Sequence, residues 1–322
     1  MPSTSPPAPI DDLAINAVLI AVRQAADVLC DRWSLMLLLL AHAGVSRFAD
    51  FREQSGMANR QLTSRLTTLE AQEILVRMPY MRRPLRYGYH LTHMGLALFD
   101  VLATLLRWEH DWYPRPGATA VRLEHTACGA PHVLPKLNCA HCGEEVTARS
   151  VGELRVSQRE IERMPSKATP YRRSATSAAG QAADLPAPLA RGIDIFGDKW
   201  SIEIVVAAFM RVRSFGGFQA HTGISTNILA DRLQRLVALN ILRQTTALEP
   251  GRTGAYLLTA KAVALYPVLL AIQAWADEWL PDRLRSPIRL KHEPCGESLR
   301  LQCVCDVCRQ PLLRDGAVFR IA

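Results

Sequence analysis

A short Trp-centred phrase occurs twice in this chain of 322 residues and marks a long internal repeat. Residues 30–34 are CDRWS and residues 197–201 are GDKWS, so the two copies are 167 positions apart (30 to 197). The same offset relates many later residues, among them Phe48/Phe215, Phe51/Phe218, Arg65/Arg232, Tyr89/Tyr256, Trp108/Trp275 and Cys128/Cys295. A period this long predicts two complete domains, because solenoid repeats are far shorter.

Hydrophobic periodicity and turn residues predict the same series of elements in each copy. In the first copy we expect helical structure over 11–43 with a break near 30–31, a short helix over 48–54 and a turn at Gly56. A helix over 59–71 follows, with Leu62, Leu66 and Leu69 on one face. Two strands over 74–78 and 87–92 and a long helix over 93–112 complete the copy, and the series returns over 189–280. This order predicts a winged helix-turn-helix.

The motifs in this order resemble those of the HxlR family of winged-helix transcription regulators. The matching residues are the Asp-Arg-Trp and Asp-Lys-Trp of the repeated phrase, Phe48 to Phe51 and Phe215 to Phe218, Leu62 to Leu69 and Leu229 to Leu236, and Tyr89 to Thr92 and Tyr256 to Thr259. Cys30 and Ser214 depart from the family pattern, as do the tandem copies and their Cys-rich tails. The resemblance implies a DNA-binding regulator, with repression the expected direction, that acts as a dimer.

The predicted fold class is therefore mainly α with small β elements. Two winged helix-turn-helix domains are each followed by a zinc-ribbon-like segment. The expected boundaries are a disordered tail over 1–10, a first domain over 11–115, a zinc-binding segment over 120–150, a linker over 151–188, a second domain over 189–282 and a second zinc-binding segment over 287–322. The Ala, Pro, Ser and Arg content of 166–188 supports the linker.

Candidate DNA-contacting residues lie on the third helix of the unit and in the loop between the two strands. Arg60, Gln61 and Ser64 lie away from the leucine face, where their side chains suit base edges in a major groove. The loop carries Arg82, Arg83 and Arg86, which suit phosphate contacts. A solvated basic loop is the alternative interpretation.

The second copy is a weaker candidate for DNA contact. Its corresponding helix residues are Asn227 and Asp231, and its loop contains Glu249 and Arg252. We expect Asn227 and Arg252 to contact DNA if this copy binds a half-site. The other interpretation is that the copy has diverged toward a partner or dimerising role.

Each copy ends in a tail with the metal-ligand pattern H-x2-C followed by C-x2-C. The first tail offers His125, Cys128, Cys139 and Cys142, and the second offers His292, Cys295, Cys305 and Cys308. One histidine and three thiolates fill a closed tetrahedral Zn²⁺ shell, so the spacing predicts two structural zinc ions per chain, one in each tail. Competing ligands are His132, His141 and Cys303, and the alternatives to zinc are free thiols or a redox pair. Glycines after the ligands predict knuckle turns with positive φ.

Two tryptophan sets and one cysteine stand outside these sites. Trp33 and Trp200 favour core packing, and Trp108/Trp112 and Trp275/Trp279 favour burial of the final helices against another element. Cys30 is either a small buried hydrophobe or a thiol with a lowered pKa at a helix start. The resemblance adds that some relatives sense oxidants or electrophiles through such a cysteine.

Bulk properties limit the class of protein. The chain is 49% hydrophobic and carries a net charge of +8, which suits a polyanionic partner. Its longest apolar run is too short for a membrane span, and its first residues lack a signal-peptide pattern. We therefore expect a cytoplasmic protein whose eight cysteines are not in disulfides.

Three functions are consistent with these observations. The leading hypothesis is a sequence-specific transcription regulator that binds double-stranded DNA and is not an enzyme. The first alternative is a redox- or metal-responsive switch that uses the cysteine sites, and the second is a protein-interaction scaffold. We also expect the two copies to form an intramolecular pseudo-dimer, with a homodimer of whole chains and a small-molecule effector as further possibilities. The target sequence and the effector are not encoded in any motif.

Overall fold

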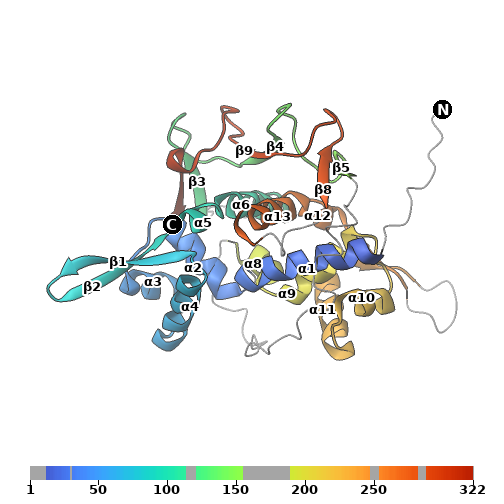
Figure 1. Ribbon diagram of the computed structural model, residues 1–322, viewed down its shortest axis with the longest axis horizontal. Coiled ribbons are helices and arrows are strands. Elements are labelled where there is room, and N and C mark those ends of the chain that lie inside the picture. The colour runs from blue at the N-terminus through green and yellow to red at the C-terminus, as the bar shows by residue number, and fades with distance from the viewer. Residues whose placement is uncertain are drawn as a thin grey trace.

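The computed structural model describes residues 12–29, 31–113, 121–154, 189–246, 254–281 and 288–321. In these residues it has helices and short two-stranded antiparallel sheets, which is the predicted α+β class. Figure 1 shows helices across the centre of the molecule and the two tails as a layer along one side. The helix-turn-helix units of the two copies lie on the opposite side, one toward each end. The residues expected to form the disordered N-terminus and most of the linker lie outside the described part.

The first copy contains the predicted winged helix-turn-helix series. Its elements are α1 (Asp12–Leu29), α2 (Arg32–His42), α3 (Phe48–Ser55), α4 (Asn59–Ala71), β1 (Leu75–Arg82), β2 (Leu85–Leu91), α5 (His93–Leu96) and α6 (Phe99–Trp112). The turn between α3 and α4 needs Gly56, whose φ of 66° lies in the left-handed region that favours glycine. The predicted break between α1 and α2 is present, and the carboxylate of Asp31 caps α2 by accepting from the Ser34 amide.

The second copy repeats this order with a shorter first helix and shorter strands. Its elements are α8 (Ala190–Phe196), α9 (Lys199–Phe209), α10 (Phe215–Thr222), α11 (Thr226–Ala238), β6 (Leu242–Gln244), β7 (Tyr256–Leu258), α12 (Ala260–Val263) and α13 (Tyr266–Trp279). Gly223 ends α10 with φ 68°, as Gly56 ends α3. Edge-to-face pairs also recur, because Phe51 packs on Tyr89 and Phe218 packs on Tyr256. The residues shared by both copies therefore hold the same local structure.

The structure corrects two expected elements of the first copy. The helix expected over 93–112 is two helices, because the Leu98 amide donates to the Gly95 carbonyl three residues earlier and tightens the chain there. The corresponding amide of Leu265 donates to Ala262 in the second copy. The strands of the first hairpin also extend further than expected, to Arg82 on one side and from Leu85 on the other.

The two copies pack against each other through equivalent elements. Helix α6 packs on α13, and α1 of the first copy packs on α9 of the second. The Trp108 indole donates to the carbonyl of Lys261 at 3.0 Å, and the Trp275 indole donates to the carbonyl of Met94 at 3.1 Å. Each contact is the other shifted by one repeat, which is the pattern of a two-fold interface. Buried apolar residues from both copies form a common core.

The tails pair with each other instead of folding separately. Their elements are β3 (Val121–His125), β4 (Lys136–Cys139), β5 (Val151–Leu154), β8 (Arg289–His292), β9 (Leu301–Val304), the 3-10 turn η2 (Arg314–Gly316) and β10 (Ala317–Ile321). Strand β3 pairs with β10, β4 with β9 and β5 with β8, so every one of these pairs joins the first tail to the second. The expectation of one self-contained ribbon per tail is therefore wrong. Residues 151–154, expected to begin the linker, instead belong to the tail because their backbone pairs with β8.

Candidate nucleic-acid interface and metal centres

Helix α4 buries its leucine face and exposes the candidate DNA-contacting face. Leu62, Leu66 and Leu69 are fully buried, as the 3.6-residue periodicity predicts. Arg60 and Ser64 lie on the exposed side, and Gln61 is half-buried between the two faces. The side chains predicted to contact base edges are thus exposed or half-exposed on the helix that follows the turn.

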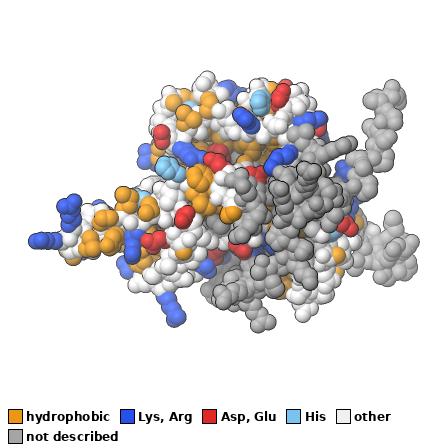
Figure 2. All heavy atoms as spheres, in the orientation of Figure 1, with side chains coloured by type: hydrophobic (Ala, Val, Ile, Leu, Met, Phe, Trp, Pro, Cys, Tyr) orange, Lys and Arg blue, Asp and Glu red, His pale blue; other side chains and the backbone are white. Residues whose placement is uncertain are grey.

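The wing of the first copy carries its arginines at its tip. Strands β1 and β2 meet at the Arg82–Leu85 pair, with Arg83 inside the turn and Arg86 opposite Met81. All three arginines are exposed. Figure 1 shows this hairpin reaching out from the body of the molecule, and Figure 2 shows Lys or Arg side chains at its end. Arginine side chains also cover its aromatic residues, since Arg47 lies over Tyr80 and Arg77 lies over Tyr87.

The second copy presents a different face. Asn227 is exposed on α11, in the position that Arg60 occupies on α4. Asp231, which corresponds to Ser64, is 66% exposed and pairs with Arg232. Arg252 lies outside the described residues, so its expected DNA contact stays a prediction. The exposed helix face of this copy is therefore less basic than that of the first.

The Asp and Arg of the repeated motifs anchor each helix-turn-helix to the helix before it. Arg65 of α4 pairs with Asp31 at 3.2 Å, and Arg232 of α11 pairs with Asp198 at 2.7 Å. Asp31 and Asp198 cap α2 and α9, and their backbones form an antiparallel bridge between the two copies. The repeated phrase thus ties α4 and α11 to the point where the two copies meet. Trp33 and Trp200 pack against the core, as predicted.

Two clusters of metal-ligating side chains occur in the tail layer. The first contains His125, Cys128, Cys305 and Cys308, and the second contains Cys139, Cys142, His292 and Cys295. All eight residues predicted as ligands lie in these two clusters, but each cluster combines the H-x2-C pair of one tail with the C-x2-C pair of the other. The expected site within each tail is wrong, because the strand pairing between tails places each pair opposite its partner from the other copy.

The distances within each cluster fit a tetrahedral zinc shell. Zn–S bonds of about 2.3 Å and Zn–N bonds of about 2.0 Å place ligand nitrogen and sulfur atoms about 3.5 Å apart, and two sulfur atoms about 3.8 Å apart. The His125 Nδ1 atom lies 3.3 Å from Cys128 Sγ and 3.4 Å from Cys308 Sγ. In the second cluster, His292 Nδ1 lies 3.3 Å from Cys142 Sγ, and the Cys139 and Cys295 sulfurs are 3.9 Å apart.

Backbone geometry next to the ligands agrees with the predicted knuckle turns. Gly129, Gly143 and Gly296 have φ values of 70°, 78° and 77°, so the expected positive φ is confirmed at all three. Arg309 takes the fourth such position with φ 64°. Both histidines are buried, which holds their rings against the sulfurs. Each cluster could hold one metal ion.

The competing ligands do not join either cluster. His132, His141 and Cys303 are absent from the groups of possible metal ligands found in the described residues. Cys303 is buried in β9, and burial together with the nearby Asp100 carboxyl raises the pKa of its thiol well above the usual value. This is the environment of an inert core thiol. Cys30 lies outside the described residues.

Comparisons with known proteins identify the family. The HxlR-like helix-turn-helix family model matches residues 28–116 and 195–284, which together make up more than half of the chain. The chain belongs to the HxlR-like helix-turn-helix family. Both copies of the repeat are matched, so this HxlR-like chain carries two of the family's domains, with α3–α4 and α10–α11 as their helix-turn-helix pairs.

Proteins similar to this chain include transcription regulators. The chain is 38% identical over 131 residues to the HTH-type transcriptional regulator Rv3095 of Mycobacterium tuberculosis, a match that covers 41% of this chain and 82% of that protein. It is 29% identical over 110 residues to YodB of Bacillus subtilis, covering 34% of this chain and 97% of YodB. The HxlR-like chain is accordingly a DNA-binding transcriptional regulator.

Two solved structures are also similar. PA1607, described as a proposed transcription factor, is 34% identical with a TM-score of 0.28, covering 41% of this chain and 87% of PA1607. PA1374 from Pseudomonas aeruginosa is also described as a proposed transcription factor. It is 25% identical with a TM-score of 0.30, and the match covers 38% of this chain and 83% of PA1374. Among the described helices of the HxlR-like chain, none has the length and apolar character needed to cross a membrane.

Proposed function

We propose that this chain is a repressor that binds an asymmetric DNA site as an intramolecular pseudo-dimer. The observation that carries the proposal is the exposed face of α4 with Arg60 and Ser64, next to a wing whose tip holds three exposed arginines. Helix α11 lies on the same side of the molecule as α4 (Figure 1). One duplex could therefore meet both copies, with the first copy making the base and phosphate contacts that specify and hold the site.

The contacts between copies support a fixed pseudo-dimer. The reciprocal Trp108 and Trp275 hydrogen bonds, the α6–α13 packing and the shared Asp31–Asp198 bridge each join the first copy to the second. A dimer of single-domain subunits presents two identical helices to a two-fold site. In this chain the two helices differ, since Arg60 and Ser64 correspond to Asn227 and Asp231. The proposed site is therefore asymmetric in sequence.

We further propose that each cross-tail cluster holds one structural Zn²⁺. The donor set of three thiolates and one imidazole is the composition of closed structural zinc sites. The ligands would be His125, Cys128, Cys305 and Cys308 at one site and Cys139, Cys142, His292 and Cys295 at the other. Zinc would supply crosslinks between the tails and so between the copies, with no catalytic role for the chain. The DNA-facing helices lie on the other side of the molecule.

A salt-dependent DNA-binding measurement tests the proposal. A duplex is first selected from a random-sequence library by the wild-type chain, and fluorescence anisotropy then gives its affinity over a range of salt concentrations. Replacing Arg82, Arg83 and Arg86 with alanine should weaken binding to selected and unselected duplexes alike. The slope of log affinity against log salt should flatten by up to ~3 units, because three phosphate contacts are lost.

The matched control removes three exposed arginines from the tail layer instead. Arg149, Arg300 and Arg314 are all exposed there, so their replacement with alanine changes the net charge equally. This control should leave the affinity and the slope near the wild-type values. Equal losses in both triple variants would show a general charge effect and contradict the assignment of the wing.

A further inference from the structure

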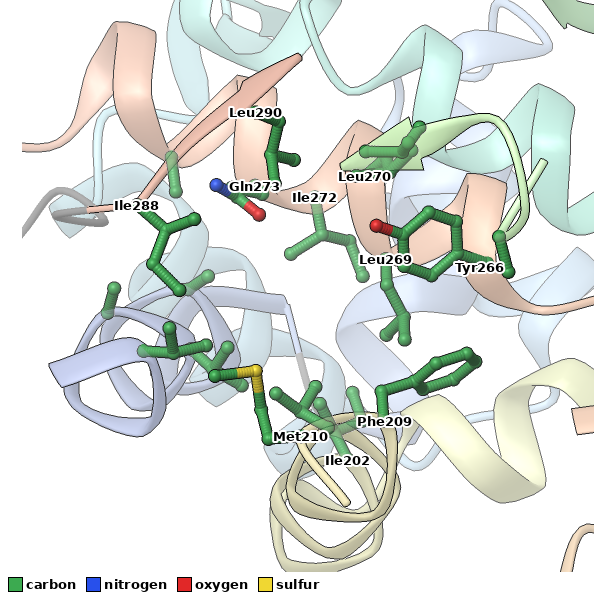
Figure 3. A pocket seen from close by; sticks show the side chains of 18 of the residues that line it. Ile202, Phe209, Met210, Tyr266, Leu269, Leu270, Ile272, Gln273, Ile288 and Leu290 are labelled. Carbon is green, nitrogen blue, oxygen red and sulfur yellow. The ribbon is translucent and has the colours of Figure 1, made fainter. Parts of the chain in front are cut away.

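The wing of the first copy exposes many of its large apolar side chains. Elsewhere such side chains mostly lie inside, as Ile202 and Ile272 do where they face the space between the copies (Figure 3). On the wing, six large apolar side chains are at least 38% exposed: Val76, Met78, Tyr80, Met81, Leu85 and Tyr87. Figure 2 shows apolar side chains along this hairpin and basic ones at its end. The described part of the chain therefore leaves an apolar surface uncovered along its wing.

The winged fold does not require this apolar surface. The second copy has the same chain length between its strands, because Leu75 and Tyr89 correspond to Leu242 and Tyr256. Strands β6 and β7 pair there as β1 and β2 do. The residues that correspond to the six apolar ones are Arg243, Thr245, Ala247, Leu248, Arg252 and Gly254, so only one of them is large and apolar. A cluster of exposed apolar side chains that the fold can do without indicates an interaction surface.

The same hairpin is strongly basic, which indicates the charge of its partner. Residues 75–91 contain four arginines and no aspartate or glutamate. Arg77 pairs with Glu70 of α4 at 3.7 Å, whereas the three arginines near the tip pair with no carboxylate among the described residues. A second copy of this chain, with a net charge of +8, would bring like charge to this surface. A polyanion complements the charge of the hairpin, so DNA is the favoured partner.

At the tip of the wing, exposed apolar side chains are paired with arginines across the strands. Leu85 lies opposite Arg82, and Met81 lies opposite Arg86. Directly opposed residues of an antiparallel pair lie on the same face, so each apolar side chain has a guanidinium beside it. Leu85 is 58% exposed, more than the other five apolar residues of the wing. Phosphate contacts alone need no leucine, whereas an apolar side chain with a cation beside it suits insertion between bases that are flanked by phosphates.

Contacts along the stem hold the hairpin in place. The Arg47 guanidinium lies 5.1 Å from the centre of the Tyr80 ring, and the Arg77 guanidinium lies 4.8 Å from that of Tyr87. The Tyr89 amide donates to the Ser46 carbonyl at 2.7 Å, which ties the base of the hairpin to the chain that precedes α3. A side chain at the tip is therefore carried on a stem that is fixed to the helix-turn-helix.

We infer that Leu85 inserts between two base pairs from the minor groove, unstacks that base step and bends the duplex beside the first copy. The inference rests on the proposed function, in which α4 occupies the major groove and leaves the adjoining minor groove to the wing. Leucine side chains inserted in this way kink DNA by roughly 20–90°. Pyrimidine–purine steps such as TA and CA unstack most easily, so the insertion selects such a step. The second copy has Arg252 in place of Leu85, so the bend lies in one half of the site.

Fluorescence of the selected duplex bound to the whole chain tests the insertion. Dyes at the two ends of the duplex report bending through energy transfer. A set of duplexes with one adenine each replaced by 2-aminopurine reports unstacking, since a TA or CA step contains an adenine. Binding of the wild-type chain should raise the energy transfer and brighten 2-aminopurine at one step.

Two variants and a matched control separate insertion from affinity. Leu85→Ala should lose both the bend and the 2-aminopurine signal. Leu85→Arg, which introduces the residue found at Arg252, should also lose both signals but steepen the salt dependence by up to ~1 unit, because it adds a phosphate contact. Leu313→Ala removes a leucine that is 68% exposed in the tail layer and should bend the duplex as the wild type does.

The outcomes distinguish the insertion from the proposed function. Wild-type binding without bending, or bending that Leu85→Ala retains, would overturn the insertion and leave the proposed function standing. Absence of DNA binding by the wild-type chain would overturn the proposed function and the insertion with it. Light scattering tests the other partner, because a wild-type dimer that Leu85→Ala dissociates, with the DNA signals unchanged, would assign the surface to contact between chains. Thermal unfolding of each variant should match the wild type, since Leu85 packs in no core.

Discussion

Glu203 is a buried carboxylate whose partner comes from the other copy. Its side chain is fully buried in α9, and Arg23 of α1 pairs with it at 2.8 Å with 15% of its own side chain exposed. Burial raises the pKa of Glu203, and the hydrogen bond and charge of Arg23 oppose that rise. One repeat earlier the same position is the buried Met36. The pair therefore belongs to the contact of α1 with the second copy and has no counterpart in the first.

Removing Arg23 alone should destabilise the chain strongly. Arg23→Ala leaves the Glu203 carboxylate buried without its cation, at an expected cost of about 3–5 kcal/mol in the free energy of unfolding. The double variant Arg23→Ala with Glu203→Met introduces the residue found at Met36 and should recover most of that loss. Urea denaturation followed by circular dichroism measures both. A double variant no more stable than Arg23→Ala alone would show that the lost packing of Arg23, and not the orphaned charge, causes the effect.

At the scale of elements, the two recognition helices have the same support and different outer faces. Asp31–Arg65 and Asp198–Arg232 hold α4 and α11 alike, and the buried leucine faces are the same. The exposed sides differ in charge, because Ser64 of α4 corresponds to Asp231 of α11. Under the proposed pseudo-dimer, the carboxylate of Asp231 lies near DNA phosphates and weakens binding.

Replacing Asp231 with serine should therefore strengthen DNA binding. Removal of one exposed negative charge next to the duplex is expected to raise the affinity a few-fold, or by about 0.5–1 kcal/mol at low salt. The control Asp315→Ser removes an exposed carboxylate from the tail layer and should change the affinity little. Anisotropy titrations of both variants give the comparison. An Asp231→Ser affinity no higher than that of the control would mean that α11 does not approach the DNA.

At the scale of the whole molecule, the two tails join the first copy to the second. Each proposed zinc site takes ligands from both tails, and the strand pairs β3–β10, β4–β9 and β5–β8 also cross between them. Zinc binding to such sites contributes directly to folding free energy. Chelation should therefore loosen the joint between the copies as well as the tails themselves.

Double cysteine variants distinguish cross-tail sites from sites within each tail. Cys128→Ala with Cys308→Ala removes two ligands of one cross-tail cluster, so the purified chain should retain about one zinc of the expected two. Cys128→Ala with Cys142→Ala damages both cross-tail clusters and should retain about none. Elemental analysis of protein purified without added metal measures the content. The reverse result, with about one zinc kept only in the second variant, would restore the within-tail arrangement.

Much of this protein follows from local sequence, because local spacing determines local structure. The leucine periodicity of 59–71 gave the bounds of α4, the glycines at 56 and 223 marked the turns, and the offset of 167 predicted two equivalent domains. The exposure of Arg60 and Ser64 and the positive φ of the glycines beside the tail cysteines were predicted in the same way. Apart from the repeat itself, the residues that decide each feature lie within a few positions of one another.

The grouping of those residues was decided only by the tertiary structure. Two-residue spacing brings His125 to Cys128 and Cys305 to Cys308, but strand pairing between tails some 180 residues apart selects which pairs share a cluster. The contact between the two copies is equally nonlocal, since α1 of the first copy packs on α9 and α13 of the second. The sequence by itself determined that the chain has two domains and which Cys, His and Arg side chains each of them carries. Packing between the copies decided how those groups meet, because contacts between distant segments leave no periodic trace in the chain.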